Sequence, residues 1–408
     1  MKRPLRIGLG LAVLALMVGI VWWLRGWGRD SRPGDPRAIE RLKSLPYATW
    51  TAVGEQEALV HGVMRHDPSR AWPGVNLYSS ETEPGAFLLD MEGEILLYLE
   101  DSRERARPWK LIEAVPPDRF AALAADGAIL LVDRRGRLLW ERRRTFHHDF
   151  EVEPDGTLWA IDRRLRRVPQ LARLKPVRDD HLVAISPDGR LELEVSSVEL
   201  LLAEPELTAV AERQHRPALD LEVDIFHTNT ITPLPHDVVS DGRVLFEAGD
   251  LLTCWRNLDT VAVVDPRGPD GRPRLRWFWG PGEIEWPHHP TLVEDGNLLI
   301  FDNGTFRGWS RVIELDPASG EIVWEYRGDP PESFFTSSRG SAQRLPNGNT
   351  LITDSMSGRV FEVTPGGEIV WEFVEPRTRK RWGGTERATI YRMTRLPQWP
   401  LPAPSVEP

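Results

Sequence analysis

"VIELDPASGEIVWEY" (Val312–Tyr326) and "VFEVTPGGEIVWEF" (Val360–Phe373) are near-copies of each other within one chain. Each alternates apolar and polar residues, turns at a Pro, Gly or Ser cluster, and ends in Glu-Ile-Val-Trp-Glu. This pattern is typical of two antiparallel strands. The two tryptophans, Trp324 and Trp371, lie 47 positions apart. The chain therefore carries an internal repeat, and this repeat decides its fold.

A second hairpin precedes each copy, "LVEDGNLLIFDNG" (Leu292–Gly304) and "RLPNGNTLITDS" (Arg344–Ser355). Asp-Gly and Asn-Gly between apolar runs are strong hairpin signals. Four strands in about 45 residues are typical of a β-propeller blade. Similar segments run back to Gly85–Glu100. We therefore predict an all-β fold, a six-bladed β-propeller over residues 73–376, preceded by an N-terminal transmembrane helix. A β-sandwich would not explain one tryptophan per repeat, and we expect these rings to pack between blades.

The N-terminal segment "IGLGLAVLALMVGIVWWL" (Ile7–Leu24) is uncharged and just long enough to span a bilayer. Trp22 and Trp23 close it, as aromatic residues do at membrane interfaces, and no small-x-small cleavage site follows. We predict an uncleaved membrane anchor over residues 1–30, with a cleavable signal peptide as the alternative. The protein is then expected to cross the inner (cytoplasmic) membrane once, with its catalytic domain on the periplasmic, extracytoplasmic side.

Two further segments complete the predicted organisation. Residues 31–72 are expected to form a linker with one short helix. Residues 377–408 are expected to form a C-terminal tail, in which "ATIYRMTRL" is the candidate for a closing strand.

Composition excludes some classes of function. The net charge of −10 argues against nucleic acid as the main partner. The single cysteine, Cys254, excludes an intrachain disulfide and a Cys-rich metal site.

Histidines are scarce, 10 in 408 residues, yet two adjacent pairs occur in similar segments. The segments that enter four successive repeats carry His147-His148, His227-Thr228-Asn229, His288-His289 and Arg339. Since the innermost strand of each blade lines the central channel, we expect these side chains to meet there. Arg256, in "CWRNLDT", should lie nearby.

A pocket of imidazoles and guanidinium with few carboxylates suits a sulfate or phosphate oxyanion. Neutral imidazoles can also bind a metal, but no Asp or Glu recurs at these entries and Arg256 would oppose a cation. We therefore predict no metal site. The plainer interpretation is that each histidine caps a blade edge and that Arg256 pairs with an acidic neighbour such as Asp259.

The stretches "DIFHTNTI", "LLTCWRNLDTVAVVD" and "HHPTLVEDGNLLIFDNG" resemble the bacterial arylsulfotransferase family, and the resemblance is strongest from Phe146 to Pro376. It implies a six-bladed propeller enzyme that acts outside the cytoplasm. Such an enzyme moves a sulfuryl group from a phenolic sulfate ester to a phenol through a transiently sulfated histidine. The resemblance implies neither a nucleotide sulfate donor nor another cofactor.

The resemblance also assigns roles. His289 resembles the family nucleophile, with His288 as its rival. His227 and Arg256 resemble the oxyanion-binding pair, although an insertion that contains His236 separates them. His148 resembles the remaining histidine, with His147 as its rival. We expect substrate contacts from the following four residues: His147, Asn229, His288 and Arg339.

Two alternatives remain. One is a non-catalytic, membrane-anchored propeller that binds an anionic ligand or a protein partner. A quinone-dependent dehydrogenase is disfavoured, because such propellers usually have eight blades and need acidic calcium ligands that this sequence does not place. The enzyme hypothesis predicts that His148, His227, Arg256 and His289 converge on one cavity at the channel.

Overall fold

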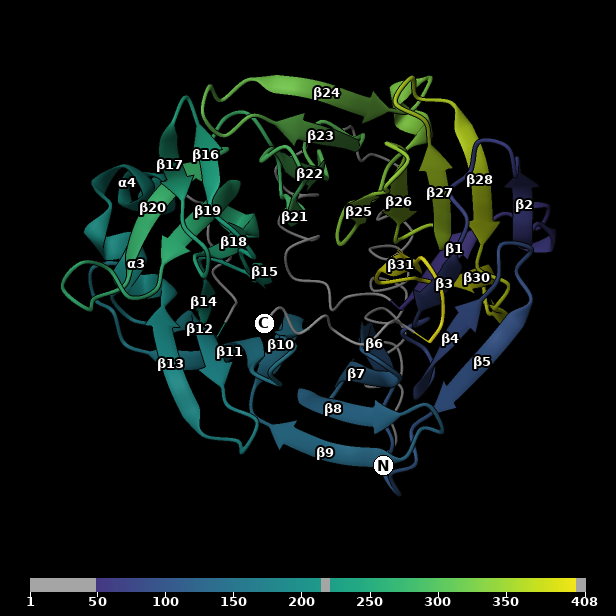
Figure 1. Cartoon of the computed structure of the whole chain (residues 1–408), viewed down its shortest axis with the longest axis horizontal. Helices are drawn as coiled ribbons and strands as arrows, with labels where there is room; N and C mark the ends of the chain where they lie inside the picture. Colours follow the sequence, from purple (N-terminus) through teal and green to yellow (C-terminus); the bar gives the residue numbers. More distant parts are fainter. Residues whose placement is uncertain (1–48, 214–220, 401–408) are drawn as a thin grey trace, which may run out of the picture. The chain divides into compact units, whose positions relative to one another are not determined.

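The computed structural model describes residues 49–213 and 221–400. Within these residues, six antiparallel sheets stand around a central axis, each with one strand nearest the axis (Figure 1). The fold is all-β and propeller-like, with one sheet for each predicted repeat. The predicted anchor (1–30) and the first part of the predicted linker lie outside the described residues. In the described part of the chain, no helix has the length and apolar character needed to span a bilayer.

The first three radial sheets come from the first half of the chain, and their strands are named from the axis outward. The first contains β31 (Met393–Leu396), β3 (Val75–Tyr78), β4 (Gly85–Leu89) and β5 (Ile95–Glu100). The second contains β6 (Trp109–Val115), β7 (Arg119–Ala124), β8 (Ala128–Asp133) and β9 (Leu138–Arg143). The third contains β10 (Phe146–Val152), β11 (Leu158–Arg166), β12 (Val177–Ile185) and β13 (Leu191–Ser196), with β14 (Val223–Asp224) paired to β12. The exception to this chain order is β31, which comes from near the C-terminus.

The other three sheets follow in chain order, except that β2, from near the N-terminus, joins the sixth. The fourth contains β15 (Thr228–Pro233), β18 (Leu251–Trp255), β19 (Thr260–Asp265) and β20 (Arg274–Trp279). The fifth contains β21 (His288–Leu292), β22 (Leu298–Asp302), β23 (Arg311–Leu315) and β24 (Ile322–Arg327). The sixth contains β25 (Ser341–Arg344), β26 (Thr350–Asp354), β27 (Arg359–Val363), β28 (Ile369–Val374) and β2 (Gly62–His66).

Smaller elements decorate this ring. They are β1 (Trp50–Val53), β29 (Thr378–Arg381) and β30 (Gly384–Ala388) in one sheet, the hairpin β16 (Val238–Ser240) and β17 (Arg243–Phe246), the helices α3 (Ser197–Ala203) and α4 (Pro205–Arg213), and the 3-10 turns η1 (Glu57–Leu59), η2 (Arg256–Leu258) and η3 (Pro331–Ser333).

The last strand of the chain closes the ring. β31 lies inside "ATIYRMTRL" and pairs with β3, placing Leu396 opposite Val75. Residues from both ends of the chain thus share the first sheet, as expected for a closing strand. At the other end, β2 extends the sixth sheet, and Val63 packs against a core cluster that contains Trp371. Residues 50–66, which we expected to lie in the linker, therefore include two paired strands, because their apolar side chains find a place on the ring.

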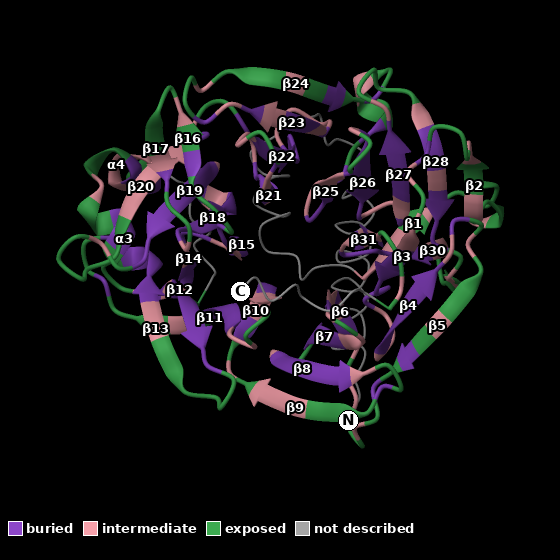
Figure 2. Cartoon of the chain, in the orientation of Figure 1, coloured by how far each residue is buried: buried purple, intermediate pink, exposed green. Residues whose placement is uncertain are grey.

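The core consists of six hydrophobic clusters, each made of residues from two neighbouring sheets. Figure 2 shows the middle strands of the sheets mostly buried, the innermost strands partly buried and the outermost strands more exposed. The repeated tryptophans join neighbouring sheets at the rim. Trp324 Nε1 donates to the carbonyl of Pro365, and Trp371 Nε1 donates to that of Met91, both at 2.9 Å. The repeated tryptophan is therefore a structural residue, as its sequence pattern indicates.

Candidate functional site

Strained backbone marks one end of the inner strands. Eight non-glycine residues of the described chain have positive φ: Glu81, His148, His227, Asp241, Asp259, Trp286, His289 and Arg339. Asp241 lies in the turn between β16 and β17, whereas the others begin inner strands or contact residues that do. This backbone region costs a non-glycine residue roughly 1–3 kcal/mol and persists only where the surroundings impose it. The strain therefore points to a functional site at the entries to the inner strands.

His227 and Arg256 are brought together by strand pairing. β15 and β18 pair with Thr228 opposite Trp255, so the intervening insertion loops away and does not separate the two residues. His236, in that insertion, is exposed to solvent. The expected His227–Arg256 neighbourhood is therefore present.

A carboxylate fixes the ring of His227. Its Nδ1 lies 2.5 Å from Asp224 Oδ2, and its backbone N–H donates to Asp224 Oδ1 at 2.9 Å. Burial opposes the charge on Asp224, but His227 and Arg178 hold the pKa of that carboxyl well below its usual range. Burial and the nearby Arg256 lower the pKa of His227, although Asp224 partly offsets them. Asp224 thus binds the Nδ1 proton and fixes the orientation of the imidazole ring.

Arg256 is held in a defined plane. Its Nε and Nη2 donate to Asn257 Oδ1 at 3.0 and 2.9 Å. Its guanidinium carbon lies 4.3 Å from the centre of the Trp286 ring. The side chain is buried, and a buried planar guanidinium fixed on two sides suits recognition of an oxyanion.

The first histidine pair contacts His227. The rings of His148 and His227 lie 4.7 Å apart, centre to centre. His147 Nδ1 lies 2.6 Å from His148 Nδ1, and its Nε2 lies 3.2 Å from Asp180 Oδ1. Burial, together with His227, His147 and Lys110, holds the pKa of His148 well below its usual value. His148 is therefore a neutral imidazole at neutral pH.

His288 has a hydrogen-bond network that defines its tautomer. Asn303 Nδ2 donates to the carbonyls of Thr336 and Arg339, both at 2.7 Å, so Asn303 Oδ1 must be the group that faces His288 Nδ1, at 2.6 Å. Nδ1 therefore carries the proton. Nε2 carries the lone pair and accepts the backbone N–H of Arg339 at 3.2 Å.

The charge state of His288 follows from its surroundings. Burial and Arg256 lower the pKa of His288 to about 3, with a further contribution from His227. The ring is thus neutral and lies within electrostatic reach of both residues. We call His148, His227, Arg256 and His288 the entry cluster.

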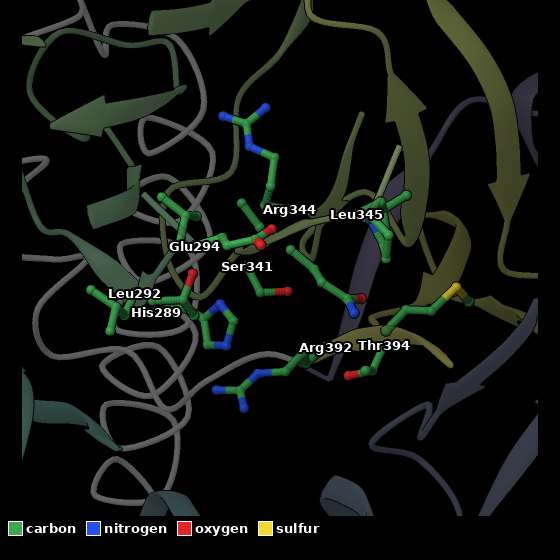
Figure 3. A pocket seen from close by; sticks show the side chains of 14 residues that line it. His289, Leu292, Glu294, Ser341, Arg344, Leu345, Arg392 and Thr394 are labelled. Atoms are coloured by element: carbon green, nitrogen blue, oxygen red, sulfur yellow. The ribbon is translucent and has the colours of Figure 1, made fainter. Parts of the chain in front are cut away.

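His289 occupies different surroundings. It lines a cavity of about 410 Å³ between β21, β25 and β31, which we call the channel cavity, together with Ser341 and Arg392 (Figure 3). Arg392 Nη2 donates to Asp149 Oδ1 at 3.0 Å, and its Nη1 lies 3.5 Å from Glu113 Oε1. Burial and Arg392 hold the pKa of His289 well below its usual value. Among the residues that line this cavity are none of the entry cluster.

The structure brings His148, His227 and Arg256 together with His288, whereas His289, which we expected in this group, lines the channel cavity. The physical reason is the hydrogen-bond network of Asn303, which holds the ring of His288 beside Arg256. His289, one residue on, belongs to the channel cavity.

Two of the expected substrate contacts have structural partners. Asn229 Nδ2 donates to the carbonyl of Pro287 at 2.9 Å, which ties the fourth sheet to the entry of β21. Arg339 Nη1 lies 3.2 Å from the buried carboxylate of Glu81. Asn229 and the side chain of Arg339 therefore stabilise the structure around the entry cluster.

Sequence reasoning missed four residues around the entry cluster: Lys110, Asp180, Asp224 and Asn303. Asp224 precedes His227 by only three positions, and this spacing could have indicated that the carboxylate binds the imidazole. The distance from each histidine to the Asp-Gly turn that follows it is a second signal. His148 stands seven positions before Asp155, and His288 stands seven positions before Asp295. This count makes His288, rather than His289, the equivalent of His148.

Within the described residues, no group of three or more His, Cys, Asp or Glu side chains is arranged to hold a metal ion.

A family model described as arylsulfotransferase (ASST) matches residues 126–376, more than half of the chain and all of the entry cluster. No curated protein matches the chain.

Among solved structures, a protein of unknown function from Bacteroides caccae is similar with a TM-score of 0.49 and 12% identity, over 79% of this chain and 98% of that one. A streptogramin B lyase is similar with a TM-score of 0.43 and 12% identity, over 80% of this chain and 86% of that one. Apo AztD from Citrobacter koseri is similar with a TM-score of 0.41 and 12% identity, over 79% of this chain and 98% of that one. Structural similarity at this level carries no argument about the function of this chain.

Proposed function

The chain belongs to the arylsulfotransferase family, and we propose that it transfers a sulfuryl group from a phenolic sulfate ester to a phenolic acceptor, with His288 as the residue that carries the group. The proposal needs no nucleotide sulfate. The observation that carries it is the hydrogen-bond network that fixes His288 as a neutral ring with its lone pair on Nε2. A neutral imidazole with a defined nucleophilic nitrogen is what covalent transfer through histidine requires.

In the first half-reaction, Nε2 of His288 attacks the sulfur of the donor. The new bond joins nitrogen to sulfur, the bond between sulfur and the phenolic oxygen breaks, and the phenolate leaves with the electron pair. The ring then carries a positive charge, since Nδ1 keeps its proton. Asn303 Oδ1, 2.6 Å from Nδ1, accepts a hydrogen bond that strengthens as this charge develops.

Negative charge on the sulfuryl oxygens needs donors fixed before the reaction. Arg256 supplies a guanidinium whose plane is set by Asn257 and Trp286. The backbone N–H of Arg339, which contacts Nε2 in the resting site, can donate instead to an oxygen of a sulfuryl group bound to Nε2. His227, oriented by Asp224 on the side of the fourth sheet, can donate from Nε2 to the same oxygens only as an imidazolium, the form that the Asp224 carboxylate favours.

In the second half-reaction, a phenol attacks the sulfur of the sulfated histidine and must lose its proton. His148 is neutral at neutral pH, so it suits the role of general base for the acceptor. The bond from nitrogen to sulfur breaks, and its electron pair restores the lone pair of His288. The low pKa of His148 makes it a weaker candidate for protonating the departing phenolate, which leaves well on its own when it is activated.

The surroundings of the two adjacent histidines favour His288 over His289 as the nucleophile. His288 lies within electrostatic reach of Arg256 and His227. The cation nearest to His289, Arg392, is already paired with Asp149. Arg344, the other arginine that lines the channel cavity, is likewise paired with Glu314. A sulfate ester bound at His289 would therefore compete with a carboxylate for either arginine.

The finer architecture and the location belong to the same proposal. We interpret the six radial sheets as six blades whose channel end holds the site. We also propose that Ile7–Leu24 anchors the chain in the inner membrane, with the blades in the periplasm. The support is the uncharged length of that segment and its terminal tryptophans. Protease treatment of spheroplasts tests the orientation, since periplasmic blades would be cut without lysis.

The activity is tested with 4-nitrophenyl sulfate as donor and a phenol as acceptor. We expect nitrophenolate release that depends on the acceptor, together with a sulfated acceptor product. Transfer that proceeds equally well in the His288→Asn variant would remove His288 from the proposal. No turnover of any aryl sulfate by the folded wild type would favour the non-catalytic, ligand-binding alternative.

A further inference from the structure

The hairpin formed by β29 and β30 carries a fully exposed tryptophan at its tip. Trp382 has a relative exposure of 108%, the highest of any large hydrophobic side chain in the described residues. Lys380 and Arg381 precede it and are also exposed, and Gly383 and Gly384 complete the turn. A single exposed indole is ordinary on a protein surface, but one that stands beside two exposed cations at the tip of a hairpin is a candidate binding surface.

The hairpin is a rigid element. β30 pairs with β29 on one side and with β1 on the other, with Val53 opposite Thr385. Arg379 Nε donates to Glu386 Oε2 at 2.7 Å, and its guanidinium carbon lies 4.3 Å from the centre of the Trp50 ring. These contacts hold Arg379 inside the small sheet. Lys380, Arg381 and Trp382 form the exposed end of the hairpin.

The partner strand β1 gives the hairpin its context. It begins at Trp50, soon after the apolar segment Ile7–Leu24, and it is the first strand of the described chain. The strand that receives the chain from the proposed anchor is therefore the one that carries the hairpin. A domain tethered in this way stays within the reach of residues 25–49 from the bilayer, so the hairpin can contact the bilayer surface.

Charge complementarity identifies the kind of surface. The chain as a whole is acidic, with a net charge of −10, so an anionic bilayer would repel most of its surface. The hairpin end is a local exception, with two exposed cations beside an indole. Lysine and arginine bind anionic headgroups, and tryptophan prefers the interface between headgroups and acyl chains. We propose that the tip of the hairpin, Lys380–Trp382, docks on the headgroup region of an anionic lipid bilayer.

The docking contact rests on the proposed anchor and is independent of the sulfuryl-transfer chemistry. It also relates to the site through the chain. β30 leads from the tip to Thr389, whose Oγ1 donates to Glu81 Oε2 at 2.8 Å and lies 3.4 Å from Arg339 Nη1. The small sheet that docks is thus joined to residues that support the entry cluster.

The test uses the full chain reconstituted in vesicles of phosphatidylcholine and phosphatidylglycerol. A Trp382→Cys variant carries an environment-sensitive fluorophore at the tip. Cys254 does not compete for the label because it is fully buried. An Asp270→Cys variant, labelled at the exposed turn between β19 and β20, is the matched control. Lipids with a nitroxide on the headgroup should quench the label at 382 roughly threefold more strongly than the label at 270, since interfacial tryptophans lie at headgroup depth.

The same labelled variant tests the contribution of the two cations at the tip. Changing Lys380 and Arg381 together to serine should abolish the extra quenching in anionic vesicles. The same change at Arg134 and Arg135, exposed in the turn between β8 and β9, should leave it intact. Equal quenching at 382 and 270 would overturn the docking contact, as would quenching at 382 that is no weaker in pure phosphatidylcholine.

Flotation with the vesicles reports the anchor separately from the hairpin. If the chain floats but the tip is not quenched, the anchor stands and the docking contact is rejected. If the chain does not float, both are rejected. In either case the sulfuryl-transfer proposal keeps its own test, because quenching is measured without substrate.

Discussion

The entry cluster and the channel cavity differ in how their positive charge is used. Each contains one member of the His288-His289 pair, an arginine and nearby carboxylates. In the entry cluster, Asp224 binds His227, while Arg256 donates to an amide oxygen and lies over an aromatic ring. In the channel cavity, Arg392 is bound to Asp149 and lies beside Glu113. The Nε and Nη2 groups of Arg256 donate to a neutral amide oxygen, whereas Arg392 donates to a carboxylate that neutralises its charge.

The carboxylates near Arg392 reinforce this difference. Burial and the charge on Asp149 raise the pKa of Glu151 to about 8, and the same two causes hold the pKa of Glu113 well above its usual value. Burial is the first cause of both shifts, so these carboxyl groups retain their protons because ionisation in that buried region is costly. Adjacent residues on one strand thus acquire different chemical capacities from the partners that surround them.

The largest expected effect is the loss of transfer in His288→Asn. The variant removes the nitrogen that would bond to sulfur, so kcat/KM for 4-nitrophenyl sulfate should fall by roughly 10³-fold or more. Thermal unfolding of the variant checks that it is folded. A decrease of only a few-fold in a folded variant would move the nucleophile out of the entry cluster.

The next effect concerns the oxyanion partner. Arg256→Gln keeps part of the side-chain length and removes the charge, so kcat/KM should fall by roughly 10²- to 10³-fold. Steady-state kinetics with donors of different leaving-group pKa measure it. Arg392→Gln is the matched variant in the channel cavity, and equal losses of kcat/KM in the two would erase the contrast between the regions.

A smaller effect, with a distinct pH signature, is expected at Asn303. In the wild type the pKa of His288 is lowered to about 3, so the ring is neutral above that value. Transfer from an activated donor should then stay nearly constant from about pH 8 to about pH 5, through the usual histidine pKa of about 6.5.

Asn303→Asp places a negative charge beside Nδ1, which favours the protonated ring and raises the pKa of His288. Activity should then fall as the pH decreases through the raised value, with a loss of roughly tenfold at neutral pH. The pH dependence of kcat/KM measures this. An unchanged acid limb in the variant would show that Asn303 does not set the charge state of the nucleophile.

The smallest effect is expected from His289→Asn, whose kcat/KM should remain within about threefold of the wild type. His289 lines the channel cavity, and that cavity contains none of the entry cluster. Parallel assays of the two asparagine variants sharpen the comparison most, because the residues are adjacent and the substitutions are identical. Inactivation by His289→Asn alone would reverse the assignment within the pair.

Much of the fold was readable from the repeat. The Glu-Ile-Val-Trp-Glu segments predict outer strands at the right places, and the closing strand within "ATIYRMTRL" is confirmed by its pairing with β3. The strands β1 and β2 were missed, since a lone strand of four or five residues after a Pro-rich segment has no local hairpin signal. Their pairing depends on β30 and β28, more than 300 positions away in the sequence.

The site was readable only in part. Histidines at repeat entries located the cluster, and strand pairing brought His227 to Arg256 as expected. The choice within the His288-His289 pair could be read from the count back from the Asp-Gly turn, but its physical cause could not, because it depends on Asn303, which lies in "FDNG" and looks like a turn residue. The partner carboxylates were equally hidden: Asp180 reaches His147 from β12, two strands away in the same sheet, and no short-range spacing records that contact.

The most direct test of the central claim is the identity of the sulfated residue. The protein is incubated with 4-nitrophenyl sulfate without acceptor, quenched and digested at alkaline pH, and the peptide containing residues 288 and 289 is analysed by fragmentation that preserves the modification. We predict the mass of one SO₃ group on His288, present in wild type and His289→Asn and absent from His288→Asn. A sulfuryl group on His289 that persists in the His288→Asn variant would contradict the account.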